Sequence, residues 1–332
     1  MHMLLRLLLL IFLATAFAPV SAGRSVRGVE PSMSRFGYPI AMPGRLPGDG
    51  FFVRHGYAVE NTWYLPGYLH TGEDWYAVEG DTAGAEVRAI ASGEVVSVGD
   101  NYPGLVVIVR HAPDLFSMYG HLDPAVAVAE GDGVAQGDVI GTVLRRADAV
   151  PSHLHFEVRT FLTTPEVNGP APLYEFNCGP GCLPGPGYWP IEAPDHPSVI
   201  GWRNPTHVIA QRAWTPEEPE GSESLGEVAV ASQPSASDVA HWSRPGGDRG
   251  ARQTGRLALV PGDRYPLLEI RAGPEDTLST SAEAYDLWYR IALPNGGSTW
   301  VQAAVPSTFE TGSDGRPATI IFNLVPANDA ST

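Results

Sequence analysis

The chain of 332 residues lacks lysine, contains only two cysteines, and has no long apolar run beyond its N-terminal segment. A further membrane-spanning helix is therefore not expected, because such a helix needs about 20 consecutive apolar residues. Two cysteines cannot supply a zinc site of their own. Its 21 basic residues, all arginine, face 37 acidic residues, so the formal net charge is −16. This acidic balance argues against nucleic-acid binding, which needs basic patches to neutralise phosphate.

The N-terminal segment has the organisation of a secretory signal peptide. His2 and Arg6 precede the apolar run 7–17, and P-V-S-A ends at Ala22. A basic start, an apolar centre and small residues at the end are typical of a cleaved signal. Cleavage after Ala22 is expected, since the apolar run is short for an uncleaved anchor. The mature protein is then predicted outside the cytoplasm, secreted or periplasmic and associated with the cell wall, without stable membrane insertion.

Three short segments hold the residues with the clearest chemistry. They are H-T-G-E-D, Y-G-H-L and H-L-H-F-E, with His70, Asp74, His121, His153 and His155. Imidazole nitrogens and one carboxylate oxygen suit a zinc ion, with bonds of about 2.0–2.2 Å and a fourth position left to water. An open fourth position distinguishes a catalytic zinc site from a structural one.

The spacing within these segments indicates strands and loops. From His153 to Arg159 polar and apolar residues alternate, which predicts a half-buried strand with both histidines on one side. Their separation of roughly 6.6–7 Å favours one metal ligand and one assisting neighbour. Gly72, between His70 and Asp74, disfavours a helix, so this segment is predicted to be a loop that runs into a strand. It is not the H-E-x-x-H helix of other zinc proteases.

These motifs resemble those of the lysostaphin-type, or LytM-type, zinc endopeptidases, which cut peptide bonds in bacterial cell walls. The resemblance extends over about residues 50–212 and includes V-R-A-I-A-S-G-E-V and E-G-D-G-V-A-Q-G-D-V-I-G. It implies that His70, Asp74 and His155 bind one Zn²⁺, while His121 and His153 serve the chemistry, with base and oxyanion-stabilising roles unassigned. It also implies an all-β, mainly antiparallel fold, an open sandwich or barrel of the duplicated hybrid motif type.

Two features depart from the family pattern. R-R-A-D-A-V-P-S at 145–152 replaces the usual glycine-rich turn, which predicts an altered rim of the groove beside the zinc. A Pro/Gly-rich insertion at about 160–200 contains Cys178 and Cys182. In an exported protein this pair predicts a small disulfide that shapes the insertion, with free thiols or a metal role as alternatives.

The remainder of the chain is divided by composition. Residues 23–49 are an N-terminal extension, and residues 213–252, rich in Pro, Gly, Ser and charge, are predicted to be a disordered linker. Residues 253–332 are predicted to form a small β-domain with a hairpin at Asn295-Gly296. This domain resembles a bacterial SH3-type wall-binding barrel; a β-domain that merely packs on the peptidase is the alternative.

Other ionisable residues near the motifs receive structural interpretations. Glu73 and Glu157 are explained as exposed polar positions, and the remaining histidines (His55, His111, His196, His207 and His241) as solvated or hydrogen-bonded residues. His111 is singled out because it follows the apolar run 105–109, a predicted buried strand, and could orient a neighbouring group.

Three classes of function are open from the sequence. The first is a secreted zinc metalloendopeptidase that hydrolyses peptidoglycan stems or cross-bridges and uses all five motif residues. The second is a non-catalytic regulator that binds other wall hydrolases. The third is a wall-binding protein with a structural zinc. The complete set of five residues favours the first.

Overall fold

The computed structural model of the protein describes residues 36–102, 104–147, 149–163, 166–167, 185, 187–212, 224–276 and 287–327. The predicted signal peptide and the predicted pairing of Cys178 with Cys182 lie outside these residues. Within the described ranges, no helix combines the length and the apolar character needed to cross a membrane.

Strands dominate the described residues. The strands of the first half are β1 (Ile40–Ala41), β2 (Phe51–His55), β3 (Tyr68–His70), β4 (Glu73–Ala77), β5 (Glu86–Arg88), β6 (Gly93–Tyr102), β7 (Gly104–Ala112), β8 (Leu115–Leu122), β9 (Gly133–Val134), β10 (Val139–Thr142) and β11 (Leu154–Arg159). There follow β12 (Tyr188–Pro190), α2 (Pro197–Ile200), β13 (Trp202–Arg203), α3 (Pro205–Arg212), β14 (Gly226–Val230), β15 (Asp238–Trp242), β16 (Gln253–Ala258), β17 (Arg264–Ala272), β18 (Leu287–Ala292), β19 (Ser298–Thr311), β20 (Pro317–Phe322) and β21 (Leu324–Pro326).

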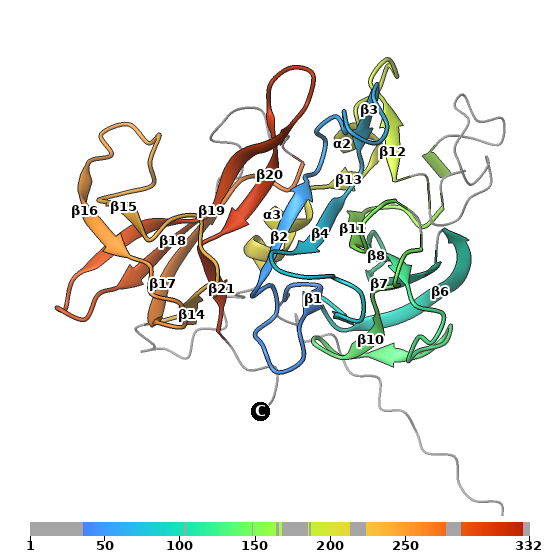
Figure 1. Cartoon of the computed structure of the whole chain (residues 1–332), viewed down its shortest axis with the longest axis horizontal. Coiled ribbons are helices and arrows are strands. Elements are labelled where there is room, and N and C mark those ends of the chain that lie inside the picture. Colours follow the sequence, from blue (N-terminus) through green and yellow to red (C-terminus); the bar gives the residue numbers. More distant parts are fainter. Residues whose placement is uncertain are drawn as a thin grey trace, which may run out of the picture. The chain divides into compact units, whose positions relative to one another are not determined.

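All strand pairings within the described ranges are antiparallel, which confirms the predicted fold class. The largest sheet has the order β21-β14-β17-β18-β19-β20-β2-β4-β11-β8-β7-β6-β9, and smaller sheets join β1-β5-β10 and β12-β3. The strands β4, β11 and β8 that carry the motifs lie side by side in it (Figure 1).

Strand β11 corrects one prediction from the sequence. It was expected to be half-buried, but all six of its residues are buried. Leu154, Phe156 and Val158 belong to the main apolar core. The polar residues on the other face are covered too, because Trp202 and Phe161 of a second small core cluster close over Glu157 and Arg159. A central strand with both faces covered can keep alternating polar residues only if each finds buried partners.

The C-terminal part confirms one local prediction and corrects another. The hairpin at Asn295-Gly296 joins β18 to β19, and Gly296 has a φ of +85°, which favours glycine. The predicted linker over 213–252 is wrong from residue 226 onward, because β14 and β15 are strands there. Val228 and Ala229 are buried and pair with both β17 and β21, so apolar burial outweighs the polar composition of the flanking residues.

The sheet also continues from the segment that carries the motifs into the C-terminal segment. Phe52 and Val53 of β2 pair with Ile321 and Ile320 of β20. The long β19–β20 hairpin, in the segment expected to be a small separate β-domain, is thereby hydrogen-bonded to the strand that precedes the first motif.

Candidate metal centre

Three motif residues meet where β3, β4 and β11 come together. His70 ends β3, a short turn through Thr71 and Gly72 follows, and Asp74 lies on β4. Asp74 and His155 are direct cross-strand partners, so their side chains project from adjacent positions on one face. The four-residue spacing of the first motif therefore brings two ligands together through a turn and not through a helix.

Gly72 allows this turn to lie against β11. A Cβ atom at this position would stand 2.3 Å from the carbonyl oxygen of Phe156 and 2.9 Å from Cγ of Glu157. No side chain fits between the two backbones. The glycine in H-T-G-E-D is therefore required by close packing.

Gly72→Ala is expected to force the turn away from β11 and to separate His70 from His155. We expect a loss of about 1–3 kcal/mol in the free energy of unfolding, as in other overpacked sites, and weaker zinc binding. Thermal unfolding and a competitive zinc titration measure the two effects. Gly99→Ala is the matched control, because its added Cβ meets no atom within 4 Å. Equal zinc affinity in both variants would contradict the packing argument.

The donor atoms of the three residues form a small triangle. His70 Nε2 lies 3.0 Å from His155 Nδ1 and 3.2 Å from Asp74 Oδ1, and His155 Nδ1 lies 3.0 Å from the same oxygen. Neighbouring ligand atoms of a tetrahedral zinc ion with bonds of about 2.0 Å are about 3.3 Å apart. Two imidazoles and one carboxylate at this spacing, all buried, fit a zinc ion with three protein ligands.

Hydrogen bonds outside the triangle orient both imidazoles. Nδ1 of His70 donates to the backbone oxygen of His55 at 3.1 Å, which leaves Nε2 directed at the triangle. Nε2 of His155 donates to Glu157 Oε1 at 3.1 Å, which leaves Nδ1 there. Such outer partners fix the tautomer and the ring orientation of metal-binding histidines.

Glu157 is buried, so its predicted exposure is wrong. In addition to His155, its oxygens accept hydrogen bonds from Thr71 Oγ1 at 2.6 Å, Trp202 Nε1 at 2.9 Å and Arg159 Nη1 at 3.2 Å. Burial acts to raise its pKa, but the hydrogen bond from His155 and the charge of Arg159 outweigh burial and keep the pKa below the usual range. Glu157 follows His155 by two residues on β11, so both side chains lie on the same face of the strand. This spacing was the sequence signal that Glu157 could contact His155.

Glu157→Gln is expected to weaken zinc binding about 10–100-fold, the usual effect of losing an outer partner of a metal ligand. The new amide NH₂ group would face two of the donor groups whose hydrogen bonds Glu157 now accepts. Because donor would then face donor, those hydrogen bonds would be lost, at an expected cost of about 1–3 kcal/mol in the free energy of unfolding. Zinc titration and chemical denaturation are the measurements. Glu94→Gln, a half-exposed glutamate paired with Arg110, serves as control. Unchanged zinc affinity in Glu157→Gln would show that the buried carboxylate does not support the site.

Two further ionisable residues, Glu73 on the other face of β4 and His55 beside the triangle, were misjudged from the sequence. Glu73 is buried, contrary to the prediction, and its Oε1 accepts from the backbone nitrogen of Thr206 in α3 at 3.2 Å. His55 is 3% exposed, and its Nδ1 lies 3.4 Å from Asp74 Oδ2, the oxygen outside the triangle. No motif marks His55, because its position follows from the pairing of β2 with β4.

The electrostatics of the triangle favour a positive charge. Burial opposes ionisation of Asp74, but the neighbouring histidines outweigh it and hold the pKa well below the usual range. Burial lowers the pKa of His70. Burial would lower that of His155 too, yet its hydrogen bonds to Asp74 and Glu157 raise it to about 9. Two buried carboxylates on either side of one imidazole suit a cation at this position.

His121 and His153 lie beside the triangle. Their ring centroids are 4.6 Å apart, and the His121 ring lies 6.3 Å from that of His155. Nδ1 of His153 donates to the backbone oxygen of Pro151 at 2.9 Å, and its Nε2 lies 3.8 Å from Asp74 Oδ1. The structure thus brings all five predicted side chains together, and their individual roles remain predictions.

Backbone and ring contacts hold the two assisting histidines in place. His121 has a φ of +62°, a left-handed conformation that is uncommon for residues other than glycine and frequent at functional sites. Its backbone oxygen accepts from Leu144 N at 2.9 Å. The ring of His153 stacks on Tyr76 at 4.8 Å, and burial lowers its pKa to about 4, so it is neutral at neutral pH.

His111 lies outside this cluster. Nδ1 of His111 donates to the backbone oxygen of Ser92 at 3.0 Å, and Nε2 pairs with Ser117 Oγ at 2.7 Å, which in turn donates to Tyr119. Burial lowers the pKa of His111 to about 4. Its hydrogen bonds reach none of the three residues of the triangle, so the orienting role considered for it is not at the candidate metal centre.

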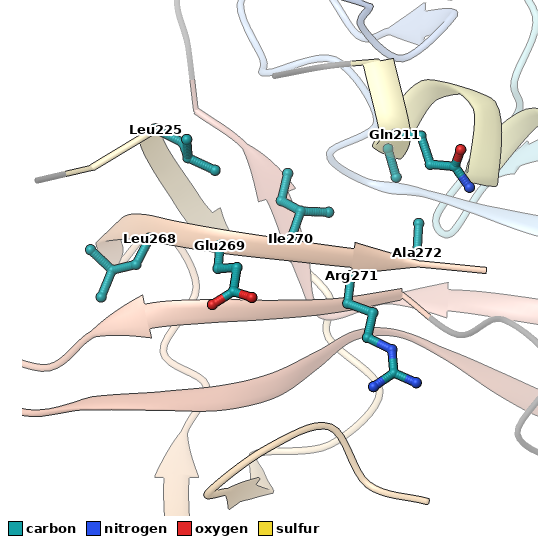
Figure 2. A pocket seen from close by; sticks show the side chains of 8 residues that line it. Gln211, Leu225, Leu268, Glu269, Ile270, Arg271 and Ala272 are labelled. Atoms are coloured by element: carbon teal, nitrogen blue, oxygen red, sulfur yellow. The ribbon is translucent and has the colours of Figure 1, made fainter. Parts of the chain in front are cut away.

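A separate hollow of about 570 Å³ lies between α3 and β17. Figure 2 shows the side chains that line it, among them Leu225, Ile270 and Ala272. None of the five motif residues contributes to its lining, and its charged members are paired, Arg271 with Asp248 and Glu269 with Arg290. It is therefore distinct from the metal centre.

An antiparallel β-protein with a buried His-Asp-His triangle and two adjacent histidines has the arrangement of a metallopeptidase. Residues 68–168, which include all five side chains, match the family described as Peptidase family M23. This match covers less than a third of the chain. No curated protein matched the sequence.

Solved structures were compared as well. A zinc-containing peptidase from Vibrio cholerae is 26% identical with a TM-score of 0.30, and the match covers 37% of this chain and 36% of that one. The catalytic domain of a prophage-encoded M23 protein, EnpA, from Enterococcus faecalis is 27% identical, with coverage of 38% and 87% and a TM-score of 0.29. The antimicrobial peptidase lysostaphin from Staphylococcus simulans is 16% identical, with coverage of 83% and 95% and a TM-score of 0.33. The chain thus spans about a third of the length of the Vibrio protein.

Proposed function

We propose that the protein is an exported zinc metalloendopeptidase that hydrolyses peptide bonds in bacterial peptidoglycan. The observation that carries this proposal is the triangle of His70, Asp74 and His155 with donor atoms 3.0–3.2 Å apart, beside two further histidines. The M23 match supports peptide hydrolysis. The wall substrate follows from the resemblance of the motifs, and export follows from the sequence of residues 1–22.

The three side chains of the triangle would hold the zinc ion. The chemistry that a bound zinc ion would supply is Lewis acidity, toward a water molecule and toward the scissile carbonyl. The protein's own contribution is orientation: the carbonyl of residue 55 and the carboxylate of Glu157 hold the two imidazoles with one nitrogen each toward the metal. The buried surroundings strengthen every charge interaction at this point.

His153 and His121 would transfer protons and stabilise the negative charge that develops on the substrate oxygen. His153 keeps its Nδ1 proton on the carbonyl of Pro151, so Nε2 is the nitrogen that can accept a proton. His121 lies against it, with rings inclined by 71°. Proton acceptance, proton delivery to the leaving amine and stabilisation of the oxyanion are divided between these two rings.

The decisive experiment uses the mature protein and purified peptidoglycan. Hydrolysis is expected to release new amino groups, to stop in the presence of a zinc chelator, and to return when zinc is added back. A non-catalytic regulator would release amino groups only with a partner hydrolase present. A protein with structural zinc would bind the wall without hydrolysis under any of these conditions. Chelator-resistant release by the pure protein would contradict a zinc mechanism.

The SH3-type wall-binding role of residues 253–332 stays a prediction.

A further inference from the structure

The exposed aromatic side chains within the described ranges gather in one place. They are Trp63 (47% exposed), Tyr64 (47%) and Phe309 (66%), which we term the aromatic rim. The guanidinium carbon of Arg54 lies 4.9 Å from the Trp63 ring centre and 5.6 Å from that of Phe309. The rings of Trp63 and Tyr64 are 6.2 Å apart. Exposed aromatic rings that cluster in this way indicate a binding surface.

The aromatic rim is continuous with the metal centre. Trp63 lies parallel to His55, with ring centres 6.1 Å apart, and His55 is next to Asp74. On the other side the Tyr64 ring is 6.0 Å from Tyr188, whose ring is 5.2 Å from the predicted ligand His70. A substrate chain that occupies the metal centre therefore reaches the aromatic rim within a few residues, at about 3.3 Å per residue.

The β19–β20 hairpin supplies one side of the aromatic rim and is fixed to the other. Arg54 Nη2 donates to Glu310 Oε1 at 2.7 Å. Thr62 Oγ1 donates to the backbone oxygen of Thr311 at 2.9 Å, and the backbone nitrogen of Ser313 donates to Glu60 at 3.0 Å. These bonds hold the segment that carries Phe309 beside the segment 60–64.

The chemistry of the aromatic rim selects an uncharged ligand with a flat apolar face. Glu310 neutralises Arg54, and the chain as a whole carries a net charge of −16, so an anionic ligand is disfavoured. The C–H face of a sugar ring carries partial positive charge and matches the negative face of an aromatic ring.

We propose that the aromatic rim is a subsite for N-acetylated hexosamine units of the peptidoglycan glycan strand, bound by stacking of their sugar rings on the exposed rings of the rim. This assignment rests on the proposed function, because it takes the wall as the substrate. The C-terminal hairpin would thereby select substrates in which the peptide is still attached to glycan.

Calorimetric titration of the full exported chain with a β-1,4-linked tetramer of N-acetylglucosamine tests the subsite without any hydrolysis. Binding is expected, and Phe309→Leu or Tyr64→Leu should weaken it roughly threefold to tenfold, since a ring contact contributes about that much. Leucine keeps the apolar volume and removes the flat ring. Val260→Ala, at a 52% exposed position in the C-terminal segment, should bind as the wild type does.

A second measurement separates this proposal from the proposed function. Phe309→Leu should raise KM more on intact peptidoglycan than on a sugar-free stem peptide. Absence of tetramer binding, or equal binding by Phe309→Leu, overturns the subsite even if the protein hydrolyses the wall. Weaker binding of the sugar-free peptide in Phe309→Leu overturns the sugar assignment. Absence of hydrolysis with intact tetramer binding would instead refute the proposed function alone.

Discussion

Alanine at position 70, 74 or 155 is expected to remove zinc and hydrolysis together. Each of these side chains places one donor atom in a buried triangle whose sides are 3.0–3.2 Å. Loss of a direct ligand should exceed the ~10–100-fold loss of affinity that follows removal of an outer partner, and turnover should fall to the background rate. Metal analysis of the purified variants, alongside initial rates on peptidoglycan, is the measurement.

The control for the ligand variants is His111→Ala. His111 is also a partly buried, hydrogen-bonded histidine, but its partners are Ser92 and Ser117 and no zinc ligand. We expect this variant to be less stable and to keep its zinc. A zinc-free His155→Ala protein with normal turnover would end the metallopeptidase proposal. Loss of zinc from His111→Ala would show instead that the metal content reports general unfolding.

Substitution of His153 or His121 is expected to have the opposite pattern, with zinc retained and turnover reduced about 10²–10⁴-fold, the usual contribution of general acid–base catalysis. His153→Phe preserves the stack on Tyr76 while it removes both ring nitrogens. For His121 we favour His121→Asn, because asparagine tolerates the left-handed φ of +62° that this position adopts.

Single-turnover rates and zinc content of these two variants, measured side by side, decide the assignment. Retained zinc with a reduced chemical step supports roles in proton transfer or oxyanion stabilisation. Zinc lost in parallel with activity would reassign the residue to metal binding or to the fold. A rate within twofold of the wild type would remove that histidine from the chemistry.

The metal-centre residues were predictable to different degrees, and the reasons are physical. His70, Asp74 and His155 lie in short motifs, and the local strand geometry of β4 and β11 turns those motifs into neighbours. Glu157 belongs to the same alternating strand, but its role depends on Trp202, which closes over it from far along the chain. Its burial could not be derived from alternation alone.

His55 and the aromatic rim had no sequence signal at all. His55 approaches Asp74 because β2 pairs with β4, and Phe309 approaches Trp63 through Arg54. Phe309 and Trp63 are far apart in the chain, and His55 and Asp74 lie on different strands, so only the tertiary structure brings the members of each pair together. The polar composition of residues 213–252 was misleading for the same reason, since Val228 gains its burial from β17 and β21.

By itself, the sequence determined the turn at Asn295-Gly296, the strand that begins near His153 and the residue types suited to a metal, because turn chemistry, strand alternation and ligand type are local properties. The mainly antiparallel β class and the choice among the candidate ligands came from the resemblance of the motifs. The tertiary structure alone decided which carboxylate orients His155, which histidine lies next to Asp74 and which rings form the aromatic rim. These depend on strand order and register, and the free energy of burying polar groups in pairs is realised only when distant strands meet.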